Sequence, residues 1–260
     1  FKNLKKDSIA IINSDDKYAS KIIESINCKY YTYGFNKKSD LSVIDYKLMI
    51  DSSTAIIKYK KKNYNLKTHL IGKFNLHNIM ASILCCVNTG INMENIIDSI
   101  KPFKNVSGRL EKYAIPNKKS IALIDYAHSP DAFEKVFKAV NEFKKNKKII
   151  TIFGCGGNRD KGKRSMMGKI AEKFSNYIYL TNDNPRNENP EQIINDIKRG
   201  ISNYDRTKII YDRKKAIEIA LGKANNSIIL ILGKGPEEYQ IINDEKIPHS
   251  DIDIVKNYLN

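Results

Sequence analysis

A glycine-rich segment, Gly154–Ser165 (GCGGNRDKGKRS), follows an apolar run and also carries several basic residues. Read from Gly157 it runs G-x-x-x-x-G-K-R, which departs from a nucleotide-binding P-loop only at its last position. A P-loop has Ser or Thr there to bind magnesium through the hydroxyl, whereas this chain has Arg164. A glycine loop between a strand and a helix still favours an anion at the helix N-terminus, and a guanidinium suits a carboxylate as well as a phosphate. The loop therefore predicts an anionic ligand other than Mg-ATP.

Three further polar segments also follow apolar, strand-like runs. They are DYAHSPDA at 125–132, NDNPRNENP at 182–190 and GKGPEEY at 233–239. In an open parallel sheet, ligands bind where the carboxyl ends of the strands and the helix N-termini converge. Each segment alone could be an ordinary turn, and DNPR in particular fits an Asx-Pro turn. Together with the glycine loop, the four segments predict one shared binding cleft.

The elements that must position these segments alternate along the chain from about residue 107. Short apolar runs start near residues 121, 148, 177, 208 and 227, and helical patterns cover 130–145, 165–175, 190–201, 213–224 and 250–259. Strands that are apolar throughout are typical of a sheet covered on both faces, so the second part predicts an α/β fold with a doubly wound, mostly parallel sheet. The first part has short Ile- and Tyr-rich strand patterns up to about residue 70, then helical patterns at 75–90 and 92–103. We therefore predict two domains, residues 1–106 and 107–260.

Composition and charge argue against several classes of protein. The 260-residue chain has a net charge of +16, yet only seven of its 45 basic residues are arginine. Lysine is spread over the whole chain, which indicates a compositional bias and no dedicated nucleic-acid-binding face. No apolar run approaches the ~20 residues of a membrane span, and no signal segment is recognisable. The cysteines lack metal-ligand spacing, so we expect no metal site in this chain and reduced thiols in a cytoplasmic protein, at Cys28, Cys85, Cys86 and Cys155.

The order of the motifs along the chain is itself informative. AIINSDD and GKFNLHNIMAS come first, GRLE and DYAHSPDA follow, and GCGGNRDKGKR, TNDNPRNENP and GKGPEEYQ complete the series. This series resembles the Mur ligase family over essentially the whole chain, and within it the ligases that add the third residue of the peptidoglycan stem peptide. The resemblance implies that residues 1–106 are the C-terminal portion of a central ATPase domain and that 107–260 form a Rossmann-like domain binding the incoming amino acid. Because the chain starts at Phe1, we expect a P-loop, the magnesium ligands and a carbamylated lysine to precede it, and the chain alone to be inactive.

The resemblance also implies a reaction and its partners. ATP, with Mg²⁺, phosphorylates the D-glutamate carboxylate of UDP-N-acetylmuramoyl-L-alanyl-D-glutamate, and the amine of meso-diaminopimelate then attacks the acyl phosphate. A cytoplasmic monomer that binds neither nucleic acid nor membrane is expected. The alternatives are a Mur-type ligase that adds L-lysine, a non-catalytic Rossmann-like module, and a basic nucleic-acid-binding domain.

A set of residues at the strand ends is implied to bind meso-diaminopimelate: Arg159, Asp183, Asn184, Pro185, Arg186, Gly233 and Glu237. This amino acid has a second carboxylate and a second ammonium at its far end. Arg186 can hold that carboxylate by a bidentate pair, and Asp183 or Glu237 can hold the ammonium. Arg159 would pair with a carboxylate of the same substrate, and Gly233 lets the backbone approach it.

A second set is implied to contact the nucleotide. Asn75 and Asn78 match positions that face adenine, and an Asn amide offers both a donor and an acceptor to a base edge; both could instead cap the following helix. Arg109 and Asp125 match residues near the ribose and phosphates. His128 is implied to lie by the reaction centre as a catalytic residue, with a purely structural role as the alternative.

One residue departs from the family pattern. Where the family usually has the sequence GKGHE, this chain has Pro236 in place of the histidine. Proline fixes φ and removes a backbone donor, so the loop shape that places Glu237 is an open question at the level of sequence.

Overall fold

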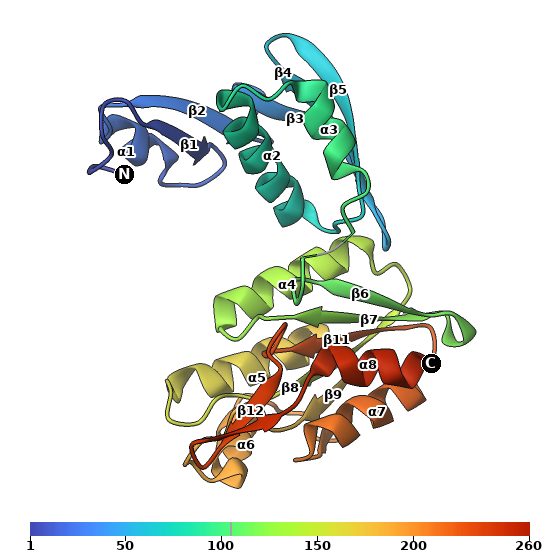
Figure 1. The fold of residues 1–260 in the computed structure, drawn as a ribbon. Coiled ribbons are helices and arrows are strands. Elements are labelled where there is room, and N and C mark those ends of the chain that lie inside the picture. The colour runs from blue at the N-terminus through green and yellow to red at the C-terminus, as the bar shows by residue number, and fades with distance from the viewer. Residues whose placement is uncertain (105) are drawn as a thin grey trace. The chain divides into compact units, whose positions relative to one another are not determined.

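The computed structural model describes residues 1–104 and 106–260, leaving aside the side chain of Pro116. The chain forms two compact units, Phe1–Lys104 and Asn105–Asn260, which run from blue to green and from green to red in Figure 1. Each unit has its own main sheet and its own hydrophobic core.

The first unit is built on a five-stranded sheet in the order β1-β2-β3-β4-β5. Its strands are β1 (Ile9–Asn13), β2 (Lys29–Gly34), β3 (Leu41–Leu48), β4 (Ser53–Tyr59) and β5 (Lys62–Thr68). The first three strands are parallel and the last two join as antiparallel hairpins. The helices are α1 (Ala19–Glu24), α2 (Lys73–Asn88) and α3 (Met93–Ile100). Strand β3 and helix α1 were not predicted.

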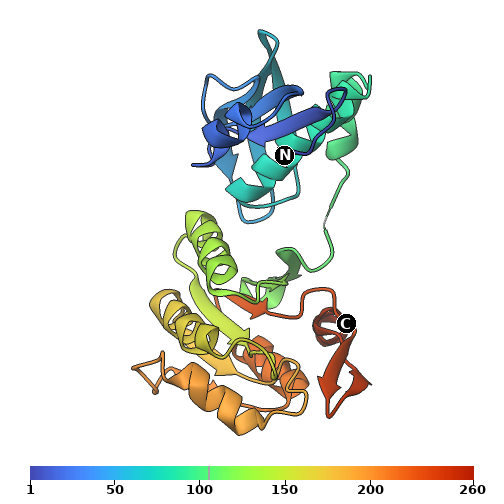
Figure 2. The same ribbon diagram turned by 90° about the vertical axis from the view of Figure 1, so that its left-hand side faces the viewer.

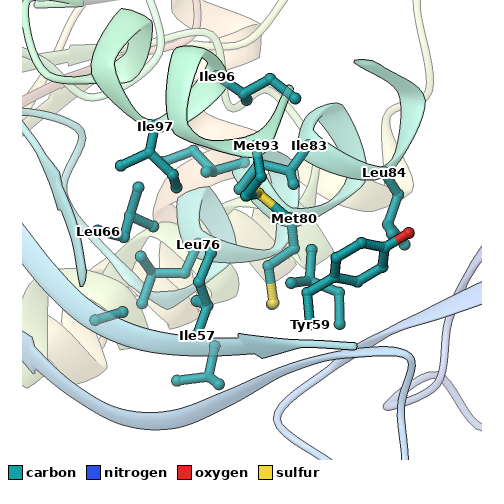
Figure 3. Close-up of a cluster of buried hydrophobic side chains, with 14 residues drawn as sticks. Ile57, Tyr59, Leu66, Leu76, Met80, Ile83, Leu84, Met93, Ile96 and Ile97 are labelled. Atoms are coloured by element: carbon teal, nitrogen blue, oxygen red, sulfur yellow. The ribbon is translucent and has the colours of Figure 1, made fainter. Parts of the chain in front are cut away.

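The core of the first unit lies between its sheet and the two longer helices. Ile57 and Leu66 point from the sheet toward Leu76 and Met80 of α2, and α3 adds Ile97 (Figure 3). Each such side chain contributes roughly 1.5–3 kcal/mol when it is fully buried. This packing fixes the first two turns of α2, where the predicted nucleotide residues Asn75 and Asn78 lie.

The second unit contains a six-stranded sheet in the order β10-β9-β8-β11-β7-β6. Its strands are β6 (Glu111–Ile115), β7 (Ser120–Asp125), β8 (Lys148–Phe153), β9 (Tyr177–Leu180), β10 (Thr207–Ile209) and β11 (Ser227–Leu232). All neighbours are parallel except the edge strand β6, which runs antiparallel to β7. The predicted doubly wound, mostly parallel α/β sheet is confirmed.

Helices cover both faces of this sheet, which is why its inner strands are apolar throughout. On one face lie α4 (Pro130–Phe143), α5 (Gly162–Phe174) and α6 (Pro190–Lys198), which form a single layer in Figure 2. On the other face α7 (Arg213–Lys223) and α8 (Asp251–Leu259) pack against Ile150, Ile152 and Ile229. A short 3-10 helix, η1 (Pro116–Lys118), joins β6 to β7.

A small hairpin, β12 (Tyr239–Ile242) and β13 (Glu245–Pro248), precedes the last helix and was not predicted. Its two turn residues, Asn243 and Asp244, both have positive φ (47° and 65°). That backbone suits a two-residue type I′ turn, in which Asn and Asp are favoured. The hairpin gives the polar segment after β9 a second strand to lie against, since Arg186 forms a β-bridge with Ile242.

Candidate functional site

The four polar segments lie at the carboxyl ends of four neighbouring strands, β9, β8, β11 and β7. They contact one another through the backbone: the amide of Gly157 donates to the carbonyl of Asn184, and that of Gly233 donates to the carbonyl of Asp125. A side chain at Gly154 would clash, because its Cβ would lie 2.1 Å from the carbonyl oxygen of Thr181. The glycines therefore let the loops close up along one edge of the sheet, as the sequence predicted.

The basic half of the site consists of Arg159 and Arg186, which lie on the same side of the glycine loop. A Cβ added at Gly156 would be 3.0 Å from Nη1 of Arg186 and 3.5 Å from Cγ of Arg159. Nη1 of Arg186 donates to the carbonyl oxygens of Gly157 (3.0 Å) and Asn184 (3.4 Å). Neither guanidinium pairs with a carboxylate among the residues that the structure describes. Both positive charges are thus available to an anionic ligand.

The acidic half begins with Asp183, which lies directly against Gly233. A Cβ at Gly233 would lie 2.7 Å from Oδ2 of Asp183, and the backbone there has φ of 114°, so both space and conformation require glycine. Burial raises the pKa of Asp183, while the positive charges of Arg213 and Lys234 oppose that rise. A cationic ligand group placed beside this carboxylate would favour its ionised form in the same way.

Asn184 and Glu237 are held together by a lysine that the sequence reading did not single out. The ammonium of Lys234 donates to Oδ1 of Asn184 (3.0 Å) and to Oε2 of Glu237 (2.7 Å), and Nδ2 of Asn184 donates to the same Oε2 (3.1 Å). The side chain of Lys234 is fully buried and that of Glu237 is 21% exposed. Glu237 is therefore fixed at the site despite Pro236, which lies against Gly108.

Two other residues of these segments serve the fold. Pro185 is buried, and its carbonyl oxygen would lie 1.8 Å from a Cβ at Gly157, so it closes the loop against the glycines. Arg164 is fully buried and makes a bidentate pair with Glu188, with both N–O distances 2.7 Å, and a further bond of 2.9 Å to Asp196. Arg164, which stands at the last position of the P-loop-like pattern, is thus paired with carboxylates inside the protein and does not face a ligand.

The segment after β7 and the residues just before β6 combine buried and exposed groups. Both carboxylate oxygens of Asp125 accept backbone amides, from Leu110 and Ala127, each at 2.8 Å, so this side chain shapes the loop. Arg109 is exposed and lies over the ring of Tyr126, with Cζ 5.2 Å from the ring centroid.

His128 is exposed at the end of the same segment, and its Nδ1 lies 2.9 Å from the carbonyl oxygen of Tyr126. Since a carbonyl can only accept, Nδ1 carries the hydrogen in this contact. Nε2 of the neutral ring then has a free lone pair and can accept a proton. The arrangement suits a general base on the rim of the site.

The two predicted adenine residues differ in orientation. The side chain of Asn75 is buried, and its Nδ2 donates to the carbonyl oxygen of Ile71 (2.9 Å), which ties down the turn before α2. Asn78 is exposed, one turn further along α2, and its Nδ2 contacts Oδ1 of Asn75 at 3.4 Å. Of the two amides, that of Asn78 is the one open to a ligand.

The residues described here do not include a ready metal site: no group of three or more His, Cys, Asp or Glu side chains in the described part could hold a metal ion. In the same described ranges, no helix is long and apolar enough to cross a membrane.

Beneath the site lies a buried ion pair that the sequence gave no reason to expect. Arg213 and Asp251 are both fully buried and are joined at 2.8 Å and 2.7 Å. Arg213 also donates to the carbonyls of Asn182 and Leu232, the backbone positions next to Asp183 and Gly233. Burial alone would raise the pKa of Asp251, but the charge and hydrogen bonds of Arg213 outweigh it and hold that pKa well below its usual range. This pair fixes the ends of β9 and β11.

The second unit is thus a Rossmann-like domain with two arginines, unpaired with carboxylates in the described part of the chain, and two carboxylates at its strand ends, and the comparison with known families gives its class. Two family models match in chain order, the Mur ligase middle domain over residues 1–86 and the Mur ligase glutamate ligase domain over residues 108–235. The chain belongs to the Mur ligase family, which confirms the resemblance seen in its motifs.

The curated relatives show which members of the Mur ligase family the chain is similar to. The chain is 42% identical over 252 residues to the UDP-N-acetylmuramoyl-L-alanyl-D-glutamate--2,6-diaminopimelate ligase of Aquifex aeolicus, covering 96% of this chain and 51% of that protein. It is 39% identical to the ligase 1 of that name from Clostridium acetobutylicum, covering 100% and 53%. A solved structure of a ligase with that name superposes with a TM-score of 0.69 at 31% identity, covering 97% and 53%. The chain thus spans about half the length of the curated relatives it matches.

Proposed function

We propose that the protein is an ATP-dependent amide ligase that adds meso-diaminopimelate to UDP-N-acetylmuramoyl-L-alanyl-D-glutamate in peptidoglycan precursor synthesis. The second unit, from about residue 107, binds the incoming amino acid, and the first unit is the C-terminal portion of the central, ATP-binding domain. Relatives that are about 40% identical over the whole chain are named for this reaction. A cytoplasmic monomer that takes part in cell-wall synthesis, and so in cell shape and division, belongs to the same proposal.

The observation that carries the proposal is the presence of both positive and negative side chains on the neighbouring segments at the strand ends. Arg159 and Arg186 flank Gly156 without a carboxylate partner in the described residues, and Asp183 and Glu237 lie on the neighbouring segments. Meso-diaminopimelate is a zwitterion at each end, so two carboxylates and two ammonium groups must be matched. L-lysine has no distal carboxylate and would leave one guanidinium unpaired, which costs binding energy in a partly buried site.

In this reaction the protein mainly has to orient the two reacting groups and neutralise their charges. An acyl phosphate formed from the D-glutamate carboxylate and ATP is attacked by the amine of diaminopimelate, and the tetrahedral intermediate expels phosphate. Holding amine and acyl phosphate in one orientation supplies much of the acceleration. The amine must lose a proton before or during the attack, and Nε2 of His128 is the base that we assign to this step.

Candidate nucleotide contacts are proposed in each unit by itself. Asn78 offers its exposed amide to adenine, with Asn75 supporting it from within, and Arg109 supplies a positive charge for the phosphates. Asp125 supports this segment through the backbone amides that it accepts.

A direct test uses the full-length protein with UDP-N-acetylmuramoyl-L-alanyl-D-glutamate, ATP and one acceptor at a time. We expect phosphate release and a tripeptide product with meso-diaminopimelate, and at least about ten-fold lower kcat/KM with L-lysine, since one charged contact is missing. Equal use of both acceptors would assign the protein to a different specificity. Phosphate release without any peptide product would remove the ligase assignment altogether.

A further inference from the structure

We propose that Lys234 is a positioning residue that sets the preference for an acceptor with a distal ammonium group, by holding Glu237 and Asn184 in one arrangement. The inference rests on the proposed function and concerns how the same site distinguishes its acceptor. Lys234 is not assigned as a ligand contact; it acts through the two residues that it binds.

The first step is the burial of Lys234. Lysine almost never leaves water completely, yet this side chain is fully buried directly after β11. Its ammonium is matched by hydrogen bonds to Asn184 and Glu237. A buried charge is tolerated when hydrogen bonds and an opposite charge offset its desolvation penalty. If the lysine is removed, the carboxylate of Glu237 is left without its counter-charge and bears that penalty instead. The arrangement is therefore a fixed part of the site.

The second step is the orientation of Asn184. Its Oδ1 accepts two hydrogen bonds, from Lys234 and from the amide of Ile241 (2.9 Å). With both donors on the oxygen side, the amide nitrogen must face Glu237, to which it donates at 3.1 Å. Lys234 thus sets which way the amide points, and the amide in turn holds the carboxylate.

The third step is the orientation of Glu237. Lys234 and Asn184 both donate to the same oxygen, Oε2. Among the described residues Oε1 receives no hydrogen bond and is the oxygen left for a ligand. A carboxylate with one oxygen anchored presents the other in a defined direction, which is what discrimination between acceptors requires.

The fourth step is the charge balance. Asp183 and Glu237 are close enough for the negative charge of Glu237 to disfavour ionisation of Asp183. The cations Lys234 and Arg213 both favour ionised Asp183, and together they offset two of the three negative charges of Asp183, Glu237 and Asp251. The remaining negative charge matches a single ammonium group, as on the distal carbon of diaminopimelate.

The test compares two acceptors on the full-length protein: meso-diaminopimelate and 2-aminopimelate, which differs only in lacking the distal amine. For Lys234→Met we expect the KM preference for diaminopimelate to fall by about ten-fold or more, as for the loss of a charged contact, with the KM for ATP unchanged. A purely structural lysine would, on mutation, weaken both acceptors equally, and that result would overturn the proposal.

Lys246→Met is the matched control. Lys246 and Lys234 both lie over the ring of Tyr239, at 4.5 Å and 5.9 Å from its centroid, but Lys246 is exposed and has no contact with Glu237 or Asn184. Its variant should keep the wild-type preference. A loss equal to that of Lys234→Met would also overturn the proposal.

A second variant covers the case in which Lys234→Met does not fold. Glu237→Gln, at a partly exposed position, should lose the same preference, and adding Lys234→Met to a folded Glu237→Gln protein should change it no further. A retained preference in Glu237→Gln overturns the inference. If the wild-type protein does not use diaminopimelate at all, it is the proposed function that fails, so the two failures are distinguishable.

Discussion

Arg164 and Arg186 are only 22 positions apart and both contact the glycine loop, yet they differ in burial and in their hydrogen-bond partners. Arg164 is fully buried, and both of its terminal nitrogens are paired, with Glu188, Asp196 and the carbonyl of Gly156, while its buried Nε has no partner in the described residues. Arg186 is half-buried and uses Nη1 for two backbone carbonyls, with no carboxylate partner in the described residues.

On the proposed function, the difference separates an arginine that stabilises the loop from one that binds the acceptor. A fully buried guanidinium whose terminal nitrogens are already paired with carboxylates stabilises its surroundings and is out of reach of an added anion. One that is not paired with a carboxylate contributes less to the fold and keeps its charge for binding. In a chain with only seven arginines, residue type alone would assign both the same role, and only the partners distinguish them.

The largest expected effect is on stability, from Arg164→Met. The substitution leaves Glu188 and Asp196 partly buried (12% and 9% exposed) without their main partner, which costs about 3–5 kcal/mol. Urea unfolding of the full chain would measure it. Arg199→Met is the control, because Arg199 contacts the same Asp196 but is 71% exposed and should cost less than about 1 kcal/mol. Equal losses would contradict the assignment of Arg164 as the structural arginine.

The next effect is on acceptor binding, from Arg186→Ala. We expect the KM for meso-diaminopimelate to rise by about ten- to a hundred-fold, the range for a hydrogen bond to a charged group, while the KM for ATP stays the same. Steady-state kinetics of the full-length enzyme would measure both. If the two constants rise together, Arg186 is not the distal carboxylate ligand.

Acid conditions should weaken the structural cluster by a smaller amount. Hydrogen bonds from Arg164 lower the pKa of Glu188 from 4.5 to about 2. Since the folded-state pKa is the lower one, the stabilisation is complete above about pH 4.5 and is lost as the pH falls toward 2. The urea midpoint of the wild-type chain should therefore drop over this range more steeply than that of Glu188→Gln. Parallel profiles would show that the pair is not linked to folding.

The smallest effects are expected for two residues of the first unit, the buried Asn75 and the exposed Asn78, which differ in the same way as the two arginines. Asn78→Ala should raise the KM for ATP about two- to ten-fold, as for one neutral hydrogen bond, with unchanged thermal unfolding. Asn75→Ala should lower the unfolding temperature first, because the carbonyl of Ile71 loses its donor. The reverse outcome would exchange the roles of the two amides.

The sequence was sufficient for the architecture of the second unit because its strands are buried on both faces. Apolar runs such as SIILIL, at 227–232, cannot alternate when both faces are covered, and they are visible without a structure. Strand β3 was missed because Asp45 and Lys47 interrupt it, on a strand whose second half is largely exposed. The two-residue turn at Asn243 and Asp244 was a local signal for the hairpin that could have been read.

The partners of the charged residues could not be predicted. Glu188 and Asp196 lie 24 and 32 positions from Arg164 and meet it only because α5 and α6 pack side by side. Nothing in the sequence marks Lys234 as buried, because lysine side chains almost never leave water completely. Charge pairing over such separations depends on tertiary packing, so the site motifs were readable while the residues that support them were not.

The hairpin β12–β13 has a practical consequence for any attempt to transfer the proposed acceptor specificity to another protein. Arg186 has a left-handed backbone (φ 52°), its amide donates to Ile241 and its carbonyl accepts from Asn243. The DNPR tetrapeptide is thus hydrogen-bonded to the β12–β13 hairpin, more than fifty residues downstream. If the tetrapeptide alone replaced its counterpart in a lysine-adding homologue, Arg186 would lack its hydrogen bonds to the hairpin. Exchange of the tetrapeptide together with the β12–β13 hairpin would keep the backbone conformation of Arg186.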